Sequence, residues 1–174
     1  MTAGKHFFNK LAGREAIVLN VGEPAPDFHL RGDDDKEISL ASLKGKYVVL
    51  YFYPKASTPG CTCEANEFRD RKRDFDKLGA VILGCSADQV AAQARFRDKQ
   101  NLNFNLLSDP QFEVIEAYGA RRMKKFLGKS FLGIVRSTVL IAPDGKIAKI
   151  WETASSKGHA AEVLAALKEL KKGA

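Results

Sequence analysis

One segment of the chain is apolar at every position. Residues 47–53 read Tyr-Val-Val-Leu-Tyr-Phe-Tyr, and such a β-branched and aromatic run without polar alternation is typical of a strand buried on both faces of a parallel or mixed sheet. Residues 80–85 form a second apolar run and predict another strand. Because right-handed crossovers place consecutive parallel strands side by side, we expect both strands to end at the same edge of the sheet.

Other segments carry hydrophobic residues at helical or hairpin spacing. Apolar residues recur among charged ones at roughly helical spacing in three segments, which predict helices at 63–78, 87–101 and 160–170. Pairs of short apolar runs joined by turn residues predict hairpins at 28–40 and 137–151. The alternation predicts an α/β fold, in which a central mixed β-sheet is covered by helices on both faces and preceded by an N-terminal β-hairpin.

The first strand and the first helix are joined by a loop that contains a cysteine. Pro54, Pro59 and Gly60 end the strand and leave Cys61 close to the start of the helix. A helix N-terminus presents unpaired N–H groups and partial positive charge, which favour a thiolate over a thiol. Structural cysteines fill apolar core positions, whereas this one stands in a Pro/Gly/Thr loop. The sequence therefore predicts a reactive thiol at Cys61.

The same loop carries a family signature. Pro54, Thr58 and Cys61 fill the pattern Pro-x-x-x-Thr-x-x-Cys, which resembles the active-site signature of the peroxiredoxins. Further segments resemble the Q-type branch, also called bacterioferritin comigratory protein; they are 21–28, 43–46, 51–55, 106–109 and 133–138. The resemblance covers nearly all of the globular part of the chain. It implies a thioredoxin-like fold and a thiol-dependent peroxidase activity.

The resemblance also implies roles for individual residues. Cys61 would attack a hydroperoxide as a thiolate and become a sulfenic acid, and the Thr58 hydroxyl would hold the reacting atoms in line. Backbone N–H groups of Gly60 and Cys61 would stabilise charge on the peroxide, while Pro54 would shield the thiolate from water. Without the resemblance, Thr58 is typical of the start of a helix and Pro54 of the end of a strand.

One further residue of the implied site lies far downstream in the chain. Arg136 directly precedes the predicted strand at 137–142, where an arginine is ordinarily a solvated strand end. The resemblance implies instead that Arg136 lies beside Cys61, where its permanent charge favours the thiolate and orients the peroxide.

The chain departs from the family at the residue that would recycle the site. Many Q-type members carry a second, resolving cysteine five residues after the first, and Asn66 stands there. Cys63 would be rotated from Cys61 by about 200° in a regular helix, so we expect it to be a packing or incidental residue, with a strained Cys-x-Cys bridge to Cys61 as the alternative. Cys85 ends the second predicted strand and is the best internal candidate; an inert buried thiol is the competing interpretation. An external thiol that resolves the sulfenic acid directly is the third alternative.

The length of the chain and its number of cysteines limit its domain organisation and its cellular location. The 174 residues predict an N-terminal extension at 1–20 and one domain at 21–174. Phe7-Phe8 and the apolar run 16–19 would pack on the domain or on a partner chain, and the sequence leaves both open. An odd number of cysteines without a secretory signal predicts the reducing cytoplasm, and no window is apolar enough for a membrane span.

The net charge of +7 raises nucleic acid as a partner. The basic residues are dispersed, however, so we expect neither a nucleic acid nor a membrane partner. The densest basic segment, 121–126, is interpreted as a solvated loop, with the docking of an acidic reductase as the alternative. Three histidines match no ligand spacing with the cysteines and predict no metal site; they are His6, His29 and His159.

Taken together, these features predict a peroxidase that acts on hydrogen peroxide and small organic hydroperoxides. We expect it to be reduced by thioredoxin or another dithiol and to act as a monomer or weak dimer. No cofactor is implied, because the sulfur itself carries the electrons. A disulfide reductase using Cys61 and Cys63 lacks the Cys-x-x-Cys spacing. A non-catalytic redox sensor or holdase stays open.

Overall fold

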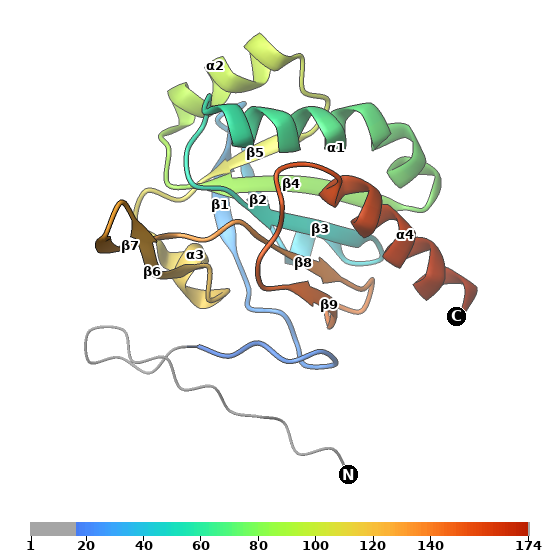
Figure 1. Cartoon of the computed structure of the whole chain (residues 1–174). Coiled ribbons are helices and arrows are strands. Elements are labelled where there is room, and N and C mark those ends of the chain that lie inside the picture. The colour runs from blue at the N-terminus through green and yellow to red at the C-terminus, as the bar shows by residue number, and fades with distance from the viewer. Residues whose placement is uncertain (1–16, 174) are drawn as a thin grey trace.

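The centre of the protein is a mixed β-sheet. The structure, a computed structural model, describes residues 17–173 (Figure 1); the predicted packing of Phe7-Phe8 and most of the predicted extension lie outside these residues. Within them, seven strands pair in the order β2-β1-β5-β4-β3-β8-β9. The strands of this sheet are β1 (His29–Gly32), β2 (Glu37–Ser39), β3 (Tyr47–Phe52), β4 (Ala80–Ser86), β5 (Asn105–Ser108), β8 (Ser137–Ile141) and β9 (Ile147–Trp151).

Strand β3 lies near the middle of the sheet and is buried on both faces. It pairs in parallel with β4, with Phe52 opposite Cys85, and antiparallel with β8, with Phe52 opposite Ser137. The predicted parallel neighbour is thus confirmed, and so are the N-terminal hairpin β1–β2 and the hairpin β8–β9. The unbroken apolar run in β3 is explained by its burial, because no face of the strand meets water.

Helices cover the two faces of the sheet unequally. The described helices are α1 (Pro59–Lys77), α2 (Val90–Gln100), α3 (Glu113–Ala117), α4 (His159–Lys172) and the short 3-10 helix η1 (Ala41–Leu43). Apolar side chains of α1, α2 and α4 pack on one face with Val49, Tyr51 and Tyr53. The opposite face packs against α3 and the N-terminal segment, as Figure 1 shows for α3. The prediction of helices on both faces is confirmed.

The first helix begins earlier than its apolar pattern predicts. Helix α1 starts at Pro59 rather than at Cys63, and Thr58 precedes it with an extended backbone (φ −82°, ψ 154°). Proline suits the first helical position because its fixed φ matches the helix and its missing N–H would have no partner there. Cys61 is therefore the third residue of the helix and lies inside its first turn.

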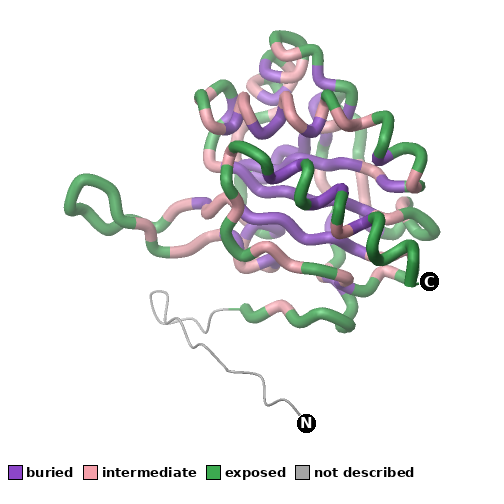
Figure 2. Tube along the Cα trace, turned by 45° about the vertical axis from the view of Figure 1, so that its right-hand side comes forward, coloured by how far each residue is buried: buried purple, intermediate pink, exposed green. Residues whose placement is uncertain are grey.

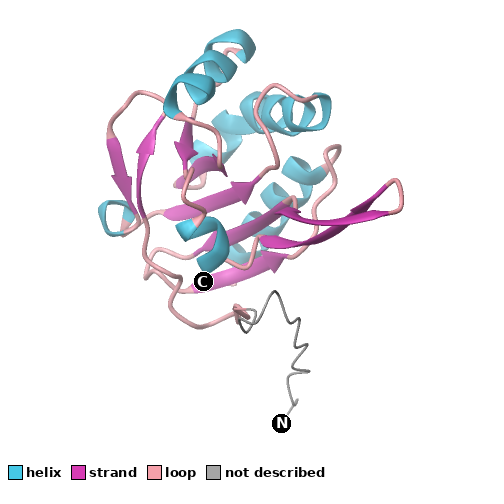
Figure 3. Cartoon of the chain, turned by 90° about the vertical axis from the view of Figure 1, so that its left-hand side faces the viewer, coloured by secondary structure: helices cyan, strands magenta, loops and turns pink. Residues whose placement is uncertain are grey.

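Two strands stand apart from the main sheet. Strands β6 (Arg121–Phe126) and β7 (Lys129–Ile134) pair antiparallel with each other to form a separate two-stranded sheet. This β6–β7 hairpin projects from the body of the protein, and its outer half is exposed (Figures 2 and 3). The interpretation of 121–126 as a solvated loop is therefore wrong, because the segment is a strand paired along its whole length.

None of the described helices combines the length and the apolar character that crossing a membrane requires.

Candidate active site

Cys61 lies in the first turn of α1, just after the loop that follows β3, and is only 2% exposed. It belongs to the apolar cluster between the sheet and helices α1, α2 and α4, together with Tyr51 and Ala65. The thiol is therefore held at the start of a helix, with hydrocarbon on its inner side.

Arg136 reaches the sulfur of Cys61. Its Nη2 donates to Sγ at 3.4 Å, and its Nη1 donates to Oε1 of Glu64 at 2.8 Å. Sheet register explains why residues so distant in sequence meet. Arg136 precedes β8, whose first residue, Ser137, lies opposite Phe52 at the end of β3. An antiparallel neighbour that starts where β3 ends must enter the sheet beside the loop that carries Cys61.

Gly60 leaves room for this contact. A Cβ atom at Gly60 would lie 3.2 Å from Arg136 Nη2, which is tighter than most real contacts, and at an ordinary contact distance of 3.6 Å from Cβ of Ser156. The first backbone bond of the helix is donated by Thr62 N to Thr58 O at 2.9 Å. The N–H groups of Gly60 and Cys61 precede it and make no backbone hydrogen bond with the described residues. Two donors are thus available at the start of α1.

Glu64 is a site residue that the sequence analysis missed. Its side chain is fully buried and bonded to Arg136 at Oε1, while Oε2 has no hydrogen-bond partner among the described residues. Burial raises the pKa of Glu64 to about 7, although the charge of Arg136 acts in the opposite direction. The signal was present in the sequence, because a carboxylate three residues after Cys61 lies on the same face of the helix.

The raised pKa of Glu64 predicts a pH-dependent stability. Between about pH 4.5 and 7, Glu64 is protonated in the folded protein but ionised in the unfolded chain. The protonated Glu64 therefore contributes to the free energy of unfolding in full below about pH 4.5, and this contribution is lost as the pH rises toward 7. In the wild type, the free energy of unfolding should decrease by at most about 3 kcal/mol over this pH range because of Glu64. In Glu64→Gln, we expect this decrease to be absent. Urea denaturation from pH 4.5 to 7.5 measures it.

Glu169→Gln is the matched control, because Glu169 is an exposed helical glutamate. An equal pH dependence in wild type and Glu64→Gln would contradict the raised pKa.

Thr58 and Pro54 border the same loop without contacting the sulfur through a hydrogen bond. The Thr58 hydroxyl donates to the carbonyl of Lys55 at 2.7 Å and does not cap α1. Its oxygen keeps its acceptor lone pairs. Pro54 follows β3 and is half-buried. The structure thus brings both predicted residues to the loop that leads to Cys61.

Cys85 lies at the predicted edge of the sheet, but its side chain faces the wrong way. It is fully buried in the cluster with Leu107 and Ile115, on the face opposite to Cys61. Neighbouring side chains of a strand alternate between the two faces, and Phe52, the register partner of Cys85, faces the same way. Burial raises the pKa of Cys85 well above its ordinary value, and the charge of Asp109 adds to this. The structure does not bring Cys85 to Cys61.

Two further positions bear on how the oxidised Cys61 is reduced again, Cys63 and Asn66, and both lie in α1. Cys63 is half-buried, and all three cysteines are free thiols. The amide of Asn66 donates to Oε1 of Gln100 at 3.3 Å, so the place of the usual resolving cysteine faces α2.

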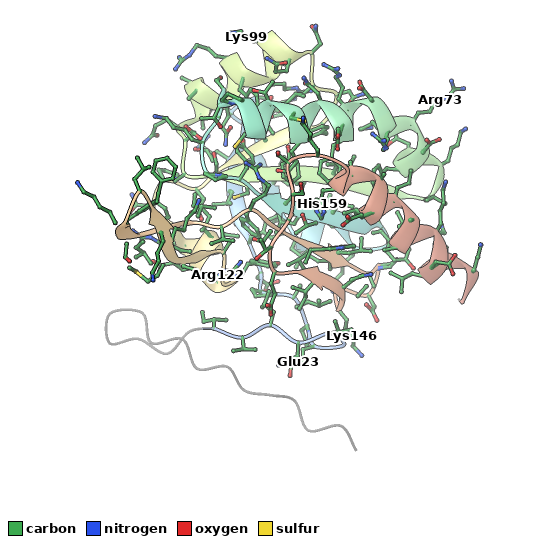
Figure 4. All side chains as sticks on the ribbon, viewed as in Figure 1. Glu23, Arg73, Lys99, Arg122, Lys146 and His159 are labelled. Carbon is green, nitrogen blue, oxygen red and sulfur yellow. The ribbon has the colours of Figure 1, made fainter. Side chains whose placement is uncertain are left out.

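Polar contacts join the segment after β9 and the start of α4 to α1 and β8. Gly158 N donates to Oε2 of Glu67 at 2.8 Å, and His159, at the start of α4, lies 2.7 Å from the Thr138 hydroxyl through Nε2 (Figure 4). Burial lowers the pKa of His159, while the charge of Glu162 acts in the opposite direction. Among residues 17–173, no group of three or more His, Cys, Asp or Glu side chains is arranged to hold a metal ion.

The β6–β7 hairpin provides a further cation near the site. Lys124 Nζ donates to the carbonyl of Ile134 at 2.9 Å. Partial burial lowers the pKa of Lys124, the positive charge of Arg136 lowers it further, and the charge of Cys61 opposes them. Because Ile134 stands two residues before Arg136, the base of the hairpin lies beside the arginine of the site.

Comparison with known proteins identifies the relatives of this chain. Residues 21–150 match the family model of the AhpC/TSA family. Peroxiredoxin Bcp of Bacillus subtilis is 44% identical over 154 residues, which cover 88% of this chain and 98% of that protein. Peroxiredoxin Bcp of Escherichia coli is 41% identical over 151 residues, covering 87% and 97%.

Solved structures agree with the sequence relatives. The bacterioferritin comigratory protein of Xanthomonas campestris, studied for its alkyl peroxide reduction activity, superimposes with a TM-score of 0.81 at 39% identity, covering 88% of this chain and 98% of that one. A mutant of PrxQ from Xylella fastidiosa gives a TM-score of 0.84 at 32% identity, with the same coverage. This chain therefore belongs to the AhpC/TSA family, as a peroxiredoxin of the Q-type or bacterioferritin comigratory protein branch.

Proposed function

We propose that Cys61 is the peroxidatic residue of this thiol-dependent peroxidase and that Arg136 is the cation that holds its thiolate. The observation that carries the assignment is the 3.4 Å contact between Arg136 Nη2 and Cys61 Sγ in the first turn of α1. A permanent guanidinium charge and a helix N-terminus both favour negative charge on sulfur.

In the proposed oxidation step, the Cys61 thiolate attacks the distal oxygen of a hydroperoxide. A sulfur–oxygen bond forms while the oxygen–oxygen bond breaks, and the leaving oxygen takes a proton to become water or an alcohol. Sulfur loses two electrons and becomes a sulfenic acid. In this proposal the N–H groups of Gly60 and Cys61 and the lone pairs of Thr58 hold the peroxide. Pro54 shields the loop without offering a donor.

The proposed substrates are hydrogen peroxide and small organic hydroperoxides. The relative from Xanthomonas campestris, which carries the name of the same branch, is described with alkyl peroxide reduction activity.

We propose that an external thiol recycles the sulfenic acid. Cys85 lies on the other face of the sheet, and Cys63 follows Cys61 by two residues in a regular helix. A donor thiolate would attack the Cys61 sulfur, water would leave, and a second donor thiol would release Cys61 as a thiol. Thioredoxin or another dithiol protein supplies both electrons in this scheme. Such recycling, together with three free cysteines, favours the reducing cytoplasm as its location.

Mass spectrometry after one equivalent of hydrogen peroxide tests the assignment. We expect the Cys61 sulfur to gain one oxygen atom, and dimedone added in a parallel sample to form a thioether at that sulfur with loss of water. Fragmentation of the peptide distinguishes Cys61 from Cys63. Oxidation at Cys63 instead would reject Cys61 as the nucleophile. A disulfide between Cys61 and Cys85 would reject the external donor and would require the sheet edge to open.

A further inference from the structure

The β6–β7 hairpin exposes more apolar side chains than any other part of the described chain. Five of the nine large hydrophobic residues that are exposed among residues 17–173 belong to it, with exposed fractions between 39% and 87%. They are Met123, Phe126, Leu127, Phe131 and Leu132. Single exposed hydrophobic residues are normal on a protein surface, but such a gathering on one projecting element indicates a binding surface.

The hairpin is also basic throughout. Between Ala120 and Pro143 the chain carries six basic residues and no carboxylate. Lys125 and Lys129 are exposed and form no ion pair with any residue of the described chain.

The register places Met123 and Leu132 on one face of the hairpin and Phe126 and Phe131 on the other. Apolar side chains on both faces, with only positive charge among them, fit a partner that can enclose the hairpin with an apolar surface and negative charges around it. A second copy fits less well, because it would bring like charges together and itself carries a net charge of +7.

The fold supports only the base of the hairpin. Val135 N donates to the carbonyl of Ala120 at 2.7 Å, and Arg122, labelled in Figure 4, donates to the carbonyl of Glu152. The outer half projects beyond these contacts (Figure 2), and neither strand pairs with a third among the described residues. A two-stranded sheet alone is only marginally stable. Packing within the described chain does not explain why the exposed side chains of the hairpin are apolar.

The position of the hairpin relative to Cys61 identifies the kind of partner. Strand β7 leads through Val135 directly to Arg136, and Lys124 Nζ donates to the carbonyl of Ile134, two residues before Arg136. An external thiol must come within bonding distance of the Cys61 sulfur. A protein that carries this thiol must therefore cover the rim of the site, part of which is the base of the hairpin.

We propose that the β6–β7 hairpin is the docking platform for an acidic dithiol protein that reduces oxidised Cys61. This rests on the proposed function. Apolar side chains at the tip contact the apolar surface around the donor's dithiol, and Lys125 and Lys129 attract its carboxylates. The donor dithiol supplies two electrons: its first thiolate displaces water from the sulfenic acid, and its second thiol breaks the mixed disulfide.

Steady-state peroxide turnover with two reductants tests the platform. One is thioredoxin of net negative charge, kept reduced by NADPH and thioredoxin reductase; the other is dithiothreitol, which needs no docking surface. For Lys125→Glu/Lys129→Glu we expect kcat/KM for thioredoxin to fall about tenfold and to lose most of its salt dependence. For Phe126→Ser/Leu127→Ser we expect a similar loss that salt does not change. Turnover with dithiothreitol should stay at the wild-type rate for both.

Lys44→Glu/Lys46→Glu is the matched control for net charge. Both lysines are exposed and lie before the start of β3, at the end of that strand opposite to Cys61. Equal loss in this variant, or unchanged thioredoxin turnover in the hairpin variants, would overturn the proposal.

Two further results would assign the hairpin to another partner and so overturn the proposal. One is a wild-type dimer in sedimentation equilibrium that the hairpin substitutions dissociate. The other is binding to phosphatidylglycerol vesicles that the same substitutions abolish while thioredoxin turnover persists. Failure of the wild type to turn over peroxide with dithiothreitol would reject the proposed function itself, and the docking proposal with it.

Discussion

Replacement of Cys61 by serine is expected to abolish peroxide consumption, with a loss in kcat/KM of at least about a thousandfold. Serine has nearly the same size, but its hydroxyl stays protonated at neutral pH and is a far weaker nucleophile toward oxygen. The contact between Sγ and Arg136 stabilises an anion that serine does not form. Peroxide consumption driven by dithiothreitol measures the loss, and circular dichroism shows that the variant stays folded.

Cys63→Ser is the matched control, since Cys63 lies in the same helix two residues away and is half-buried. It should turn over peroxide at close to the wild-type rate. Full turnover by Cys61→Ser would reject the assignment of the nucleophile.

Arg136→Gln is expected to lower kcat/KM for peroxide by about a hundredfold or more. The guanidinium bridges Cys61 Sγ and Glu64 Oε1 at once, and glutamine carries neither the charge nor the two-ended geometry. Arg136→Lys should recover only part of the loss, because one ammonium group cannot reproduce the fork of donors. The rate of alkylation by iodoacetamide should fall in parallel, since it reports the thiolate fraction.

A double variant separates this effect from simple destabilisation. Arg136→Gln alone leaves the fully buried Glu64 without a countercharge and should lower the free energy of unfolding by about 3 kcal/mol at pH 8. Arg136→Gln/Glu64→Gln should regain most of that stability, because no buried charge is left unpaired, yet remain as inactive as the single variant. Recovery of activity in the double variant would show that Arg136 acts only through stability.

The pattern of apolar residues predicted the central elements well. Strand β3, strand β4 and the terminal hairpin follow from unbroken apolar runs and turn residues, because burial on both faces leaves a direct mark on the sequence. The start of α1 was harder to predict. Pro59 and Gly60 are typical of loops, and only the helix around them reveals that they form its first turn.

The candidate site was predicted in part. Pro54 and Thr58 lie in the loop that leads to Cys61, in the first turn of α1. Arg136 was proposed from the resemblance to a family rather than from its own surroundings. Glu64 was missed although its spacing on the helix was informative, because an acidic residue in a charged segment is ordinarily solvated. The strand at 121–126 was missed because exposed strands carry no apolar alternation toward a core.

The local sequence predicted a reactive thiol at Cys61, since the residues that end a strand and start a helix are its neighbours in the chain. Which groups surround it depended on pairing between distant segments: the register of β8 against β3 delivers Arg136 to the sulfur. The alternation of side chains about β4 turns Cys85 to the far face of the sheet. The register of a strand and the face to which its side chains point are set by hydrogen bonds and packing between segments far apart in the sequence. Only the folded chain therefore shows them.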